Sequence, residues 1–190
     1  MADLAHEAGL ATHMDGARLL NAEVAAGIAA ARYAARYDTV WIDFTKGLGA
    51  PIGAVLAGSR AFIEAAWRWK QRLGGALRQG GIAAAACLYA LDHHVARLAE
   101  DHAHARRFAE RLAGIEGIAV EMPETNLVFF DVAGLGVTAA EFAARLRRDG
   151  LLLSAFGPSR LRAGFHLDIG PSETEEAAAI IRHHAAQIRA

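Results

Sequence analysis

The 190-residue chain has little of what marks several large protein classes. Its single cysteine, Cys87, excludes a disulfide scaffold and a zinc finger, so we expect a reducing, cytoplasmic setting. Its 20 Lys and Arg residues balance 21 Asp and Glu residues, without the basic surplus of nucleic-acid binders. The longest uncharged apolar stretch, residues 80–91, is too short to cross a bilayer. The first residues lack the basic region of a signal peptide.

What the chain does have is apolar content and two lysines. Hydrophobic residues make up 54% of it, which suffices to bury a core and, with a net charge of −1, excludes disorder. Lys46 and Lys70 are its only lysines. Any chemistry that needs a lysine amine therefore has two candidates.

The hydrophobic pattern predicts alternating helices and strands. Because the two kinds of segment alternate throughout, we expect an α/β fold. The organisation we expect is a partial large domain over residues 1–92, a long connecting helix over residues 93–113 and a small α+β domain over residues 114–190. The expected helices are 2–8, 17–26, 29–37, 60–72, 82–113, 138–148 and 173–189, and the expected strands are 10–14, 39–44, 52–57, 118–122, 127–132, 151–156 and 161–169.

The first motif with chemical content is His-Met-Asp-Gly-Ala-Arg, residues 13–18. Its aspartate, Asp15, follows a predicted strand, and the carboxyl ends of strands are where open α/β sheets place ligands. Aspartate is also a common helix N-cap, and the hexapeptide alone favours that interpretation. A metal site of His13 and Asp15 would need a third ligand, and none is close in sequence.

The second motif is Phe-Thr-Lys-Gly-Leu-Gly-Ala-Pro-Ile-Gly, residues 44–53, in which Lys46 leaves a strand and enters a glycine-rich turn. A Schiff-base lysine needs such a partly desolvated place, because low polarity frees the amine for attack on a carbonyl. An ordinary turn lysine explains the segment equally well. The order of residues is not that of a phosphate-binding P-loop.

Taken together, the two motifs are more specific than either alone. Asp15 and Lys46 lie on successive predicted strands, about 30 residues apart. An enzyme that uses pyridoxal 5'-phosphate (PLP) needs this pair, a lysine for the imine and a carboxylate that keeps the pyridine nitrogen protonated.

Four segments carry a resemblance to a known family: HMDGARLLNA, FTKGLGAPIGAVLAGS, RWKQRLGGALRQGG and LRAGFHLDI. In this order they resemble the low-specificity L-threonine aldolases, in the aldolase/β-eliminating lyase group of fold-type I PLP enzymes. The resemblance covers about the C-terminal half of such an enzyme. It implies that residues 1–92 are part of an aspartate aminotransferase-type PLP-binding domain.

The resemblance also implies roles for the cofactor-binding residues. Lys46 matches the lysine that holds PLP as a Schiff base, and Asp15 matches the partner of the pyridine nitrogen. Ala17 falls where the family packs a small residue against the cofactor ring. Arg18 matches an arginine that reaches both cofactor and substrate, and Arg78 resembles one that reaches the phosphate of a neighbouring subunit's cofactor.

For the substrate, the resemblance implies that Arg18 and Arg162 bind the α-carboxylate, which suits a planar guanidinium. The implied reaction is the retro-aldol cleavage of L-threonine or L-allo-threonine to glycine and acetaldehyde. The alternatives are another β-eliminating lyase or aminotransferase-like enzyme, or a non-catalytic fragment without the N-terminal half. Family members are usually homotetramers, so we expect a homo-oligomer, and we predict no metal, nucleic-acid or membrane partner.

Overall fold

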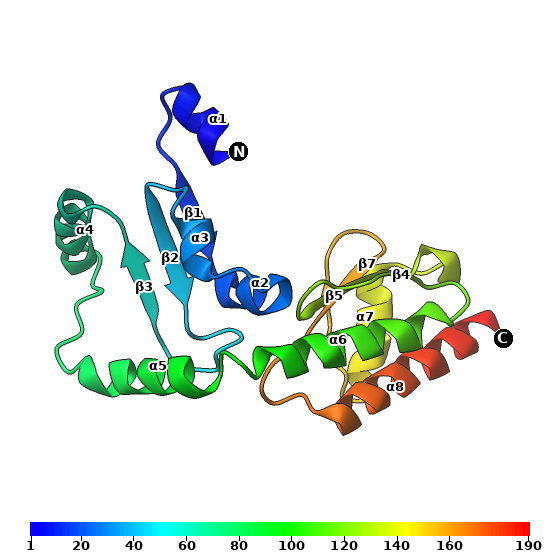
Figure 1. Ribbon diagram of the computed structural model, residues 1–190. Helices are drawn as coiled ribbons and strands as arrows, with labels where there is room; N and C mark the ends of the chain where they lie inside the picture. The colour runs from blue at the N-terminus through cyan, green and yellow to red at the C-terminus, as the bar shows by residue number, and fades with distance from the viewer. The chain divides into compact units, whose positions relative to one another are not determined.

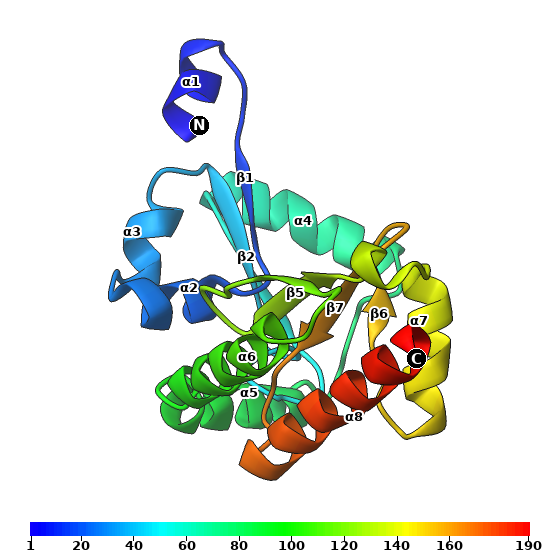
Figure 2. The same ribbon diagram turned by 90° about the vertical axis from the view of Figure 1, so that its right-hand side faces the viewer.

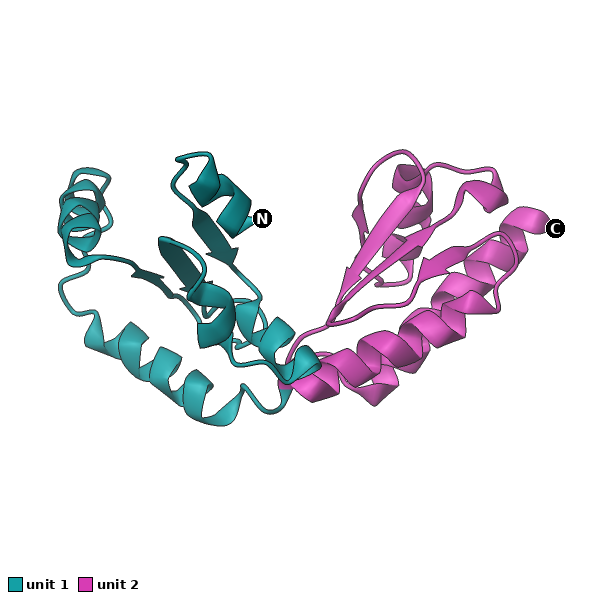
Figure 3. Cartoon of the chain, turned by 45° about the horizontal axis from the view of Figure 1, so that its top comes forward, with its two compact units in different colours: residues 1–97 teal, residues 98–190 magenta.

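Helices and strands alternate along the computed structural model, which describes all residues 1–190 (Figure 1; Figure 2). The chain divides into an N-terminal unit, residues 1–97, and a C-terminal unit, residues 98–190 (Figure 3). The N-terminal unit contains α1 (Ala2–Glu7), β1 (His13–Gly16), α2 (Leu19–Ala26), α3 (Ala30–Ala34), β2 (Thr39–Asp43), β3 (Ala54–Ala57), α4 (Arg60–Arg72) and α5 (Gly81–His93).

The sheet of the N-terminal unit has the strand order β1-β2-β3, and the three strands lie side by side in Figure 1. β1 runs parallel to β2, with Asp15 opposite Trp41, whereas β3 is antiparallel to β2. Because side chains alternate along a strand, Asp15, Trp41 and Asp43 share one face of this sheet. The hydrogen bond of 2.7 Å between His13 Nδ1 and Thr39 Oγ1, on the same face, agrees with this register.

Much of the apolar surface of the N-terminal unit is exposed. All four residues of β3 are exposed, and Trp67 and Trp69 of α4 have 54% and 58% of their surface accessible. Exposed apolar area of this extent is typical of a surface that another chain or segment covers.

The C-terminal unit contains α6 (Leu98–Ala113), β4 (Ala119–Glu121), β5 (Leu127–Asp131), the 3-10 helix η1 (Ala133–Leu135), α7 (Ala139–Arg148), β6 (Ser154–Ala155), β7 (Arg160–Gly164) and α8 (Pro171–Arg189). Its four strands form an antiparallel sheet of order β4-β5-β7-β6. The helices α6 and α8 lie side by side in both views (Figure 1; Figure 2).

One hydrophobic core holds the C-terminal unit together. Phe108 of α6, Phe142 of α7 and Ile181 of α8 are fully buried against Phe130 and Leu161 of the sheet. The three helices therefore cover one face of this sheet. The side chains that alternate with the buried ones point to the opposite face.

The predicted helix over residues 82–113 is wrong as a single element, because the structure has α5 and α6 with a turn at residues 94–97 between them. His94 Nδ1 in this turn donates a hydrogen bond of 2.6 Å to the carbonyl oxygen of Leu48. Residues 94–97 include no glycine or proline, so the sequence carries no signal for the break. The long-range bond to Leu48 accompanies a turn that local helix propensity does not predict.

Other boundaries differ by a few residues. The first strand is residues 13–16 rather than 10–14, and Thr12 just before it donates its backbone N–H to Asp38 Oδ2 at 2.7 Å. The predicted strand over 151–156 shortens to the two residues of β6. No helix is both long enough and apolar enough to cross a membrane.

Candidate active site around Lys46

Lys46 stands in a tight turn directly after β2. The amide of Gly49 donates to the carbonyl of Lys46 at 3.0 Å, and the amide of Ala50 donates to the carbonyl of Phe44 at 2.8 Å. Gly49 has φ 67°, a left-handed conformation that favours glycine. With the bond from His94 to Leu48, these contacts fix the backbone that carries the lysine.

The side chain of Lys46 turns back over the sheet. Its Nζ donates to Asp43 Oδ2 at 2.5 Å and lies 5.2 Å from the centre of the Trp41 ring. The side chain remains 37% exposed, so the amine is held yet open to a ligand. Since Trp41 and Asp43 share a face with Asp15, the amine of Lys46 lies on the Asp15 face of the sheet.

Asp43, the last residue of β2, is the buried anion of this site, with only 6% of its side chain exposed. Its Oδ1 accepts hydrogen bonds from the amide and the hydroxyl of Thr45, at 2.9 and 2.7 Å. Burial on its own raises the pKa of the Asp43 carboxyl, but the bonds from Lys46 and Thr45 outweigh burial and lower that pKa below its usual value. Asp43 is therefore ionised at neutral pH.

Asp15 lies inside β1, near its carboxyl end, and is exposed. Its Oδ1 accepts a hydrogen bond of 3.0 Å from the amide of Ala17. The helix-cap interpretation of Asp15 is wrong, because α2 starts at Leu19 with Arg18 in the cap position. Parallel strands bring their carboxyl ends to one edge of a sheet, and the carboxylate of Asp15 thus lies at the same edge as Lys46.

Ala17 and Arg18 join this edge from the segment that leads into α2. Both are half-buried, and they line a small cleft together with Ile42, Asp43 and Gly47. The structure therefore brings Asp15, Ala17, Arg18 and Lys46, all predicted from sequence, into one region of the N-terminal unit. Arg78 lies in the exposed loop between α4 and α5.

Arg162 belongs to β7 of the C-terminal unit, on the sheet face opposite the helices. It alternates with the buried Leu161 and Ala163. Arg160, two residues earlier on the same face, pairs with Glu121 at 2.6 Å. Arg162 instead packs its guanidinium 5.5 Å from the Phe156 ring and has no carboxylate partner. Of these two arginines, Arg162 is the one with its charge available.

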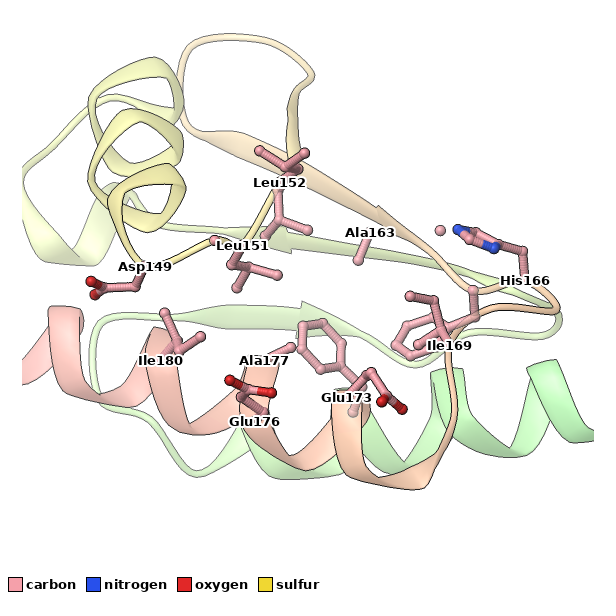
Figure 4. A pocket seen from close by; sticks show the side chains of 15 residues that line it. Asp149, Leu151, Leu152, Ala163, His166, Ile169, Glu173, Glu176, Ala177 and Ile180 are labelled. Atoms are coloured by element: carbon pink, nitrogen blue, oxygen red, sulfur yellow. The ribbon is translucent and has the colours of Figure 1, made fainter.

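A cavity of about 480 Å³ in the C-terminal unit contains none of these residues (Figure 4). Apolar side chains such as Leu151 and Ile180 form its wall, and Asp149, Glu173 and Glu176 add carboxylates without any lysine or arginine. An anionic amino-acid carboxylate would be repelled there. We therefore place the candidate site at Lys46 rather than in this cavity. No group of three or more His, Cys, Asp or Glu side chains could hold a metal ion.

Two residues that contact the amine of Lys46, Asp43 and Trp41, were not among the residues predicted from the sequence. A signal for Asp43 was present, because a carboxylate three residues before a lysine, at the end of a predicted strand, lies within reach of the amine. Trp41 lies on the same face as Asp15 because β1 pairs with β2 in this register, and the sequence alone does not reveal the register.

These features define a class of site: a partly exposed lysine amine and an exposed carboxylate on one face of a sheet, at the carboxyl ends of parallel strands. The model of the beta-eliminating lyase family matches residues 1–134. The low-specificity L-threonine aldolase 1 of Arabidopsis thaliana is 38% identical over 174 residues, 90% of this chain and 49% of that protein. The low specificity L-threonine aldolase of Escherichia coli K12 is 39% identical over 177 residues, 93% of this chain and 52% of that protein.

The chain belongs to the beta-eliminating lyase family. The solved structure of threonine aldolase from Leishmania major superimposes with a TM-score of 0.74 at 20% identity, over 97% of this chain and 54% of that one. This likeness confirms the predicted α/β fold. The chain spans about half the length of the curated relatives it matches.

Proposed function

We propose that the chain carries the lysine-bearing half of a PLP-dependent aldolase that cleaves β-hydroxy-α-amino acids, with L-threonine or L-allo-threonine giving glycine and acetaldehyde. One observation carries the proposal: the amine of Lys46 and the carboxylate of Asp15 lie on the same sheet face, at one edge. Support also comes from the two relatives, which are named low-specificity L-threonine aldolases.

The residues present fit PLP. Lys46 offers a primary amine for the aldehyde, and Asp15 offers an exposed carboxylate for a protonated pyridine nitrogen. Ala17 has the small side chain that leaves room for a ring beside that carboxylate. When bound, PLP supplies an electron sink for the electron pair left on Cα.

Arg18 and Arg162 hold the substrate carboxylate in this proposal. A guanidinium pairs with a carboxylate through two parallel hydrogen bonds, which fix orientation as well as position. With PLP bound, that orientation would decide which bond at Cα is aligned for cleavage. Support for Arg162 rather than Arg160 comes from Glu121, which already forms an ion pair with Arg160.

We further propose a homo-oligomer, a tetramer as in the resembled family, in the cytoplasm. Support for assembly comes from the exposed Trp67 and Trp69 of α4. In such an assembly Arg78, exposed and without an ion pair, would reach the phosphate of a neighbouring subunit's cofactor.

The experiment is an acetaldehyde-release assay on L-threonine with PLP present, comparing Arg162→Ala with Arg160→Ala. Loss of a charge-paired contact costs about 2 kcal/mol or more, so Arg162→Ala is expected to lower kcat/KM at least roughly 30-fold. Arg160→Ala should change it far less. Glycine and aldehyde from threonine would distinguish the aldolase from another β-eliminating lyase or an aminotransferase-like enzyme. A folded chain that binds PLP but releases no aldehyde would favour a non-catalytic fragment.

A further inference from the structure

We propose that Asp43 is a positioning residue for Lys46, and that its buried carboxylate holds the lysine amine by an ion pair above the Trp41 ring, on the sheet face that also carries Asp15. The inference deepens the proposed function and rests on it for its meaning in catalysis. Its physical content, a carboxylate that fixes an amine, can be tested without the cofactor.

The first support is the rigidity of Asp43. It ends β2 and pairs with Ala54 of β3, so the neighbouring strand restrains its backbone. Its side chain is 6% exposed and thus has little freedom to follow a moving lysine. The carboxylate is a fixed point to which the long lysine side chain adapts.

The second support is that the two carboxylate oxygens of Asp43 have different hydrogen-bond partners. Oδ1 accepts both hydrogen bonds from Thr45, which shapes the start of the turn, and Oδ2 accepts the bond from Lys46 Nζ. The contacts to Thr45 set the orientation of the carboxylate and leave Oδ2 for the amine. One side chain therefore defines both the path of the backbone and the place of the amine.

The third support is the charge balance. A buried carboxylate is costly without hydrogen bonds and a positive charge, and Lys46 supplies both. The hydrogen bonds keep Asp43 ionised at neutral pH, as its lowered pKa indicates. The Trp41 ring offers a second attraction to the ammonium, since a cation is attracted to the face of an aromatic ring. These two contacts define the position of the amine.

The test uses the only two lysines of the chain. Limiting acetic anhydride is added to the folded protein, and the acetylated fractions of the Lys46 and Lys70 peptides are compared by mass spectrometry after digestion. Lys70 is exposed, has no carboxylate partner and serves as the internal reference. In the wild type, Lys46 should react more slowly than Lys70.

Asp43→Asn keeps the size of the side chain but removes its charge. We expect the Lys46:Lys70 ratio to rise at least roughly tenfold, which corresponds to about 1.4 kcal/mol, the low end for a hydrogen bond between charged groups. Asp3→Asn is the matched control, because it removes the same charge from a carboxylate of the same unit that pairs with Arg36 rather than with Lys46. It should leave the ratio within about twofold. An unchanged ratio in Asp43→Asn with native circular dichroism would overturn the inference.

A second measurement covers the case in which Asp43→Asn does not fold. Two-dimensional NMR of the wild-type lysine ammonium groups, with Lys46→Arg for assignment, should show slower proton exchange at Lys46 than at Lys70. Equal, fast exchange at both would overturn the inference. Neither measurement uses PLP. A chain that fails to bind PLP would contradict the proposed function but would leave the result for Asp43 and Lys46 unchanged.

Discussion

Gly16→Ala tests the arrangement that places Asp15 beside Trp41. A Cβ at residue 16 would lie 2.1 Å from the carbonyl oxygen of Trp41, whereas real Cβ atoms keep at least about 3.0 Å. β1 must therefore move by about 0.9 Å away from β2 at this position. Overpacking of this kind costs about 1–3 kcal/mol or more, against about 0.4–1 kcal/mol gained from a stiffer unfolded chain. We expect a net loss of about 2 kcal/mol.

The assay is thermal unfolding followed by circular dichroism and tryptophan fluorescence. For a unit of this size, 2 kcal/mol lowers Tm by roughly 10 °C. The matched control is Gly81→Ala at the start of α5, where an added Cβ meets nothing within 4 Å and the melting temperature should stay equal or rise slightly. A Gly16→Ala variant that melts like the wild type would refute the close approach of β1 and β2.

Three further predictions concern stability. Phe142→Ala should cost about 3–5 kcal/mol in urea unfolding, because Phe142 is fully buried in the core of the C-terminal unit. Thr138→Ala should cost about 1 kcal/mol in the same assay, since it removes the capping box that Thr138 forms with Glu141 at the start of α7. The backbone and hydroxyl bonds from Thr12, aided by His6, lower the pKa of Asp38 to about 2. Asp38 should therefore stabilise the fold above about pH 4 and lose that contribution as the pH falls through about 2. Between pH 5 and pH 2, the melting temperature of Asp38→Asn should fall less than that of the wild type.

The elements that sequence predicted well are those with a strong local signal. The β-branched and aromatic run at residues 39–44 became β2, bounded at Asp43 by the turn that holds Lys46. The predicted helix over residues 60–72 is α4 to the residue, with Ser59 as its cap and a glycine shortly after it. In both, local propensity and tertiary structure agree.

The misses come from contacts between distant residues. No local rule separates α5 from α6, because the turn includes the hydrogen bond from His94 to Leu48, 46 residues away. The cap interpretation of Asp15 failed because β1 extends through Gly16, where it pairs with Ile42 of β2. Both misses depend on contacts between distant residues, and the spacing of residues in one sequence does not encode those contacts.

We propose that Lys46 is the residue to which PLP binds covalently. The most direct measurement adds PLP to the purified chain, reduces the product with borohydride and maps the modified peptide by mass spectrometry, with Lys46→Ala and Lys70→Ala as comparisons. We expect saturable modification at Lys46 that persists in Lys70→Ala and disappears in Lys46→Ala. Modification at Lys70 alone, or none in a folded wild-type chain, would contradict it.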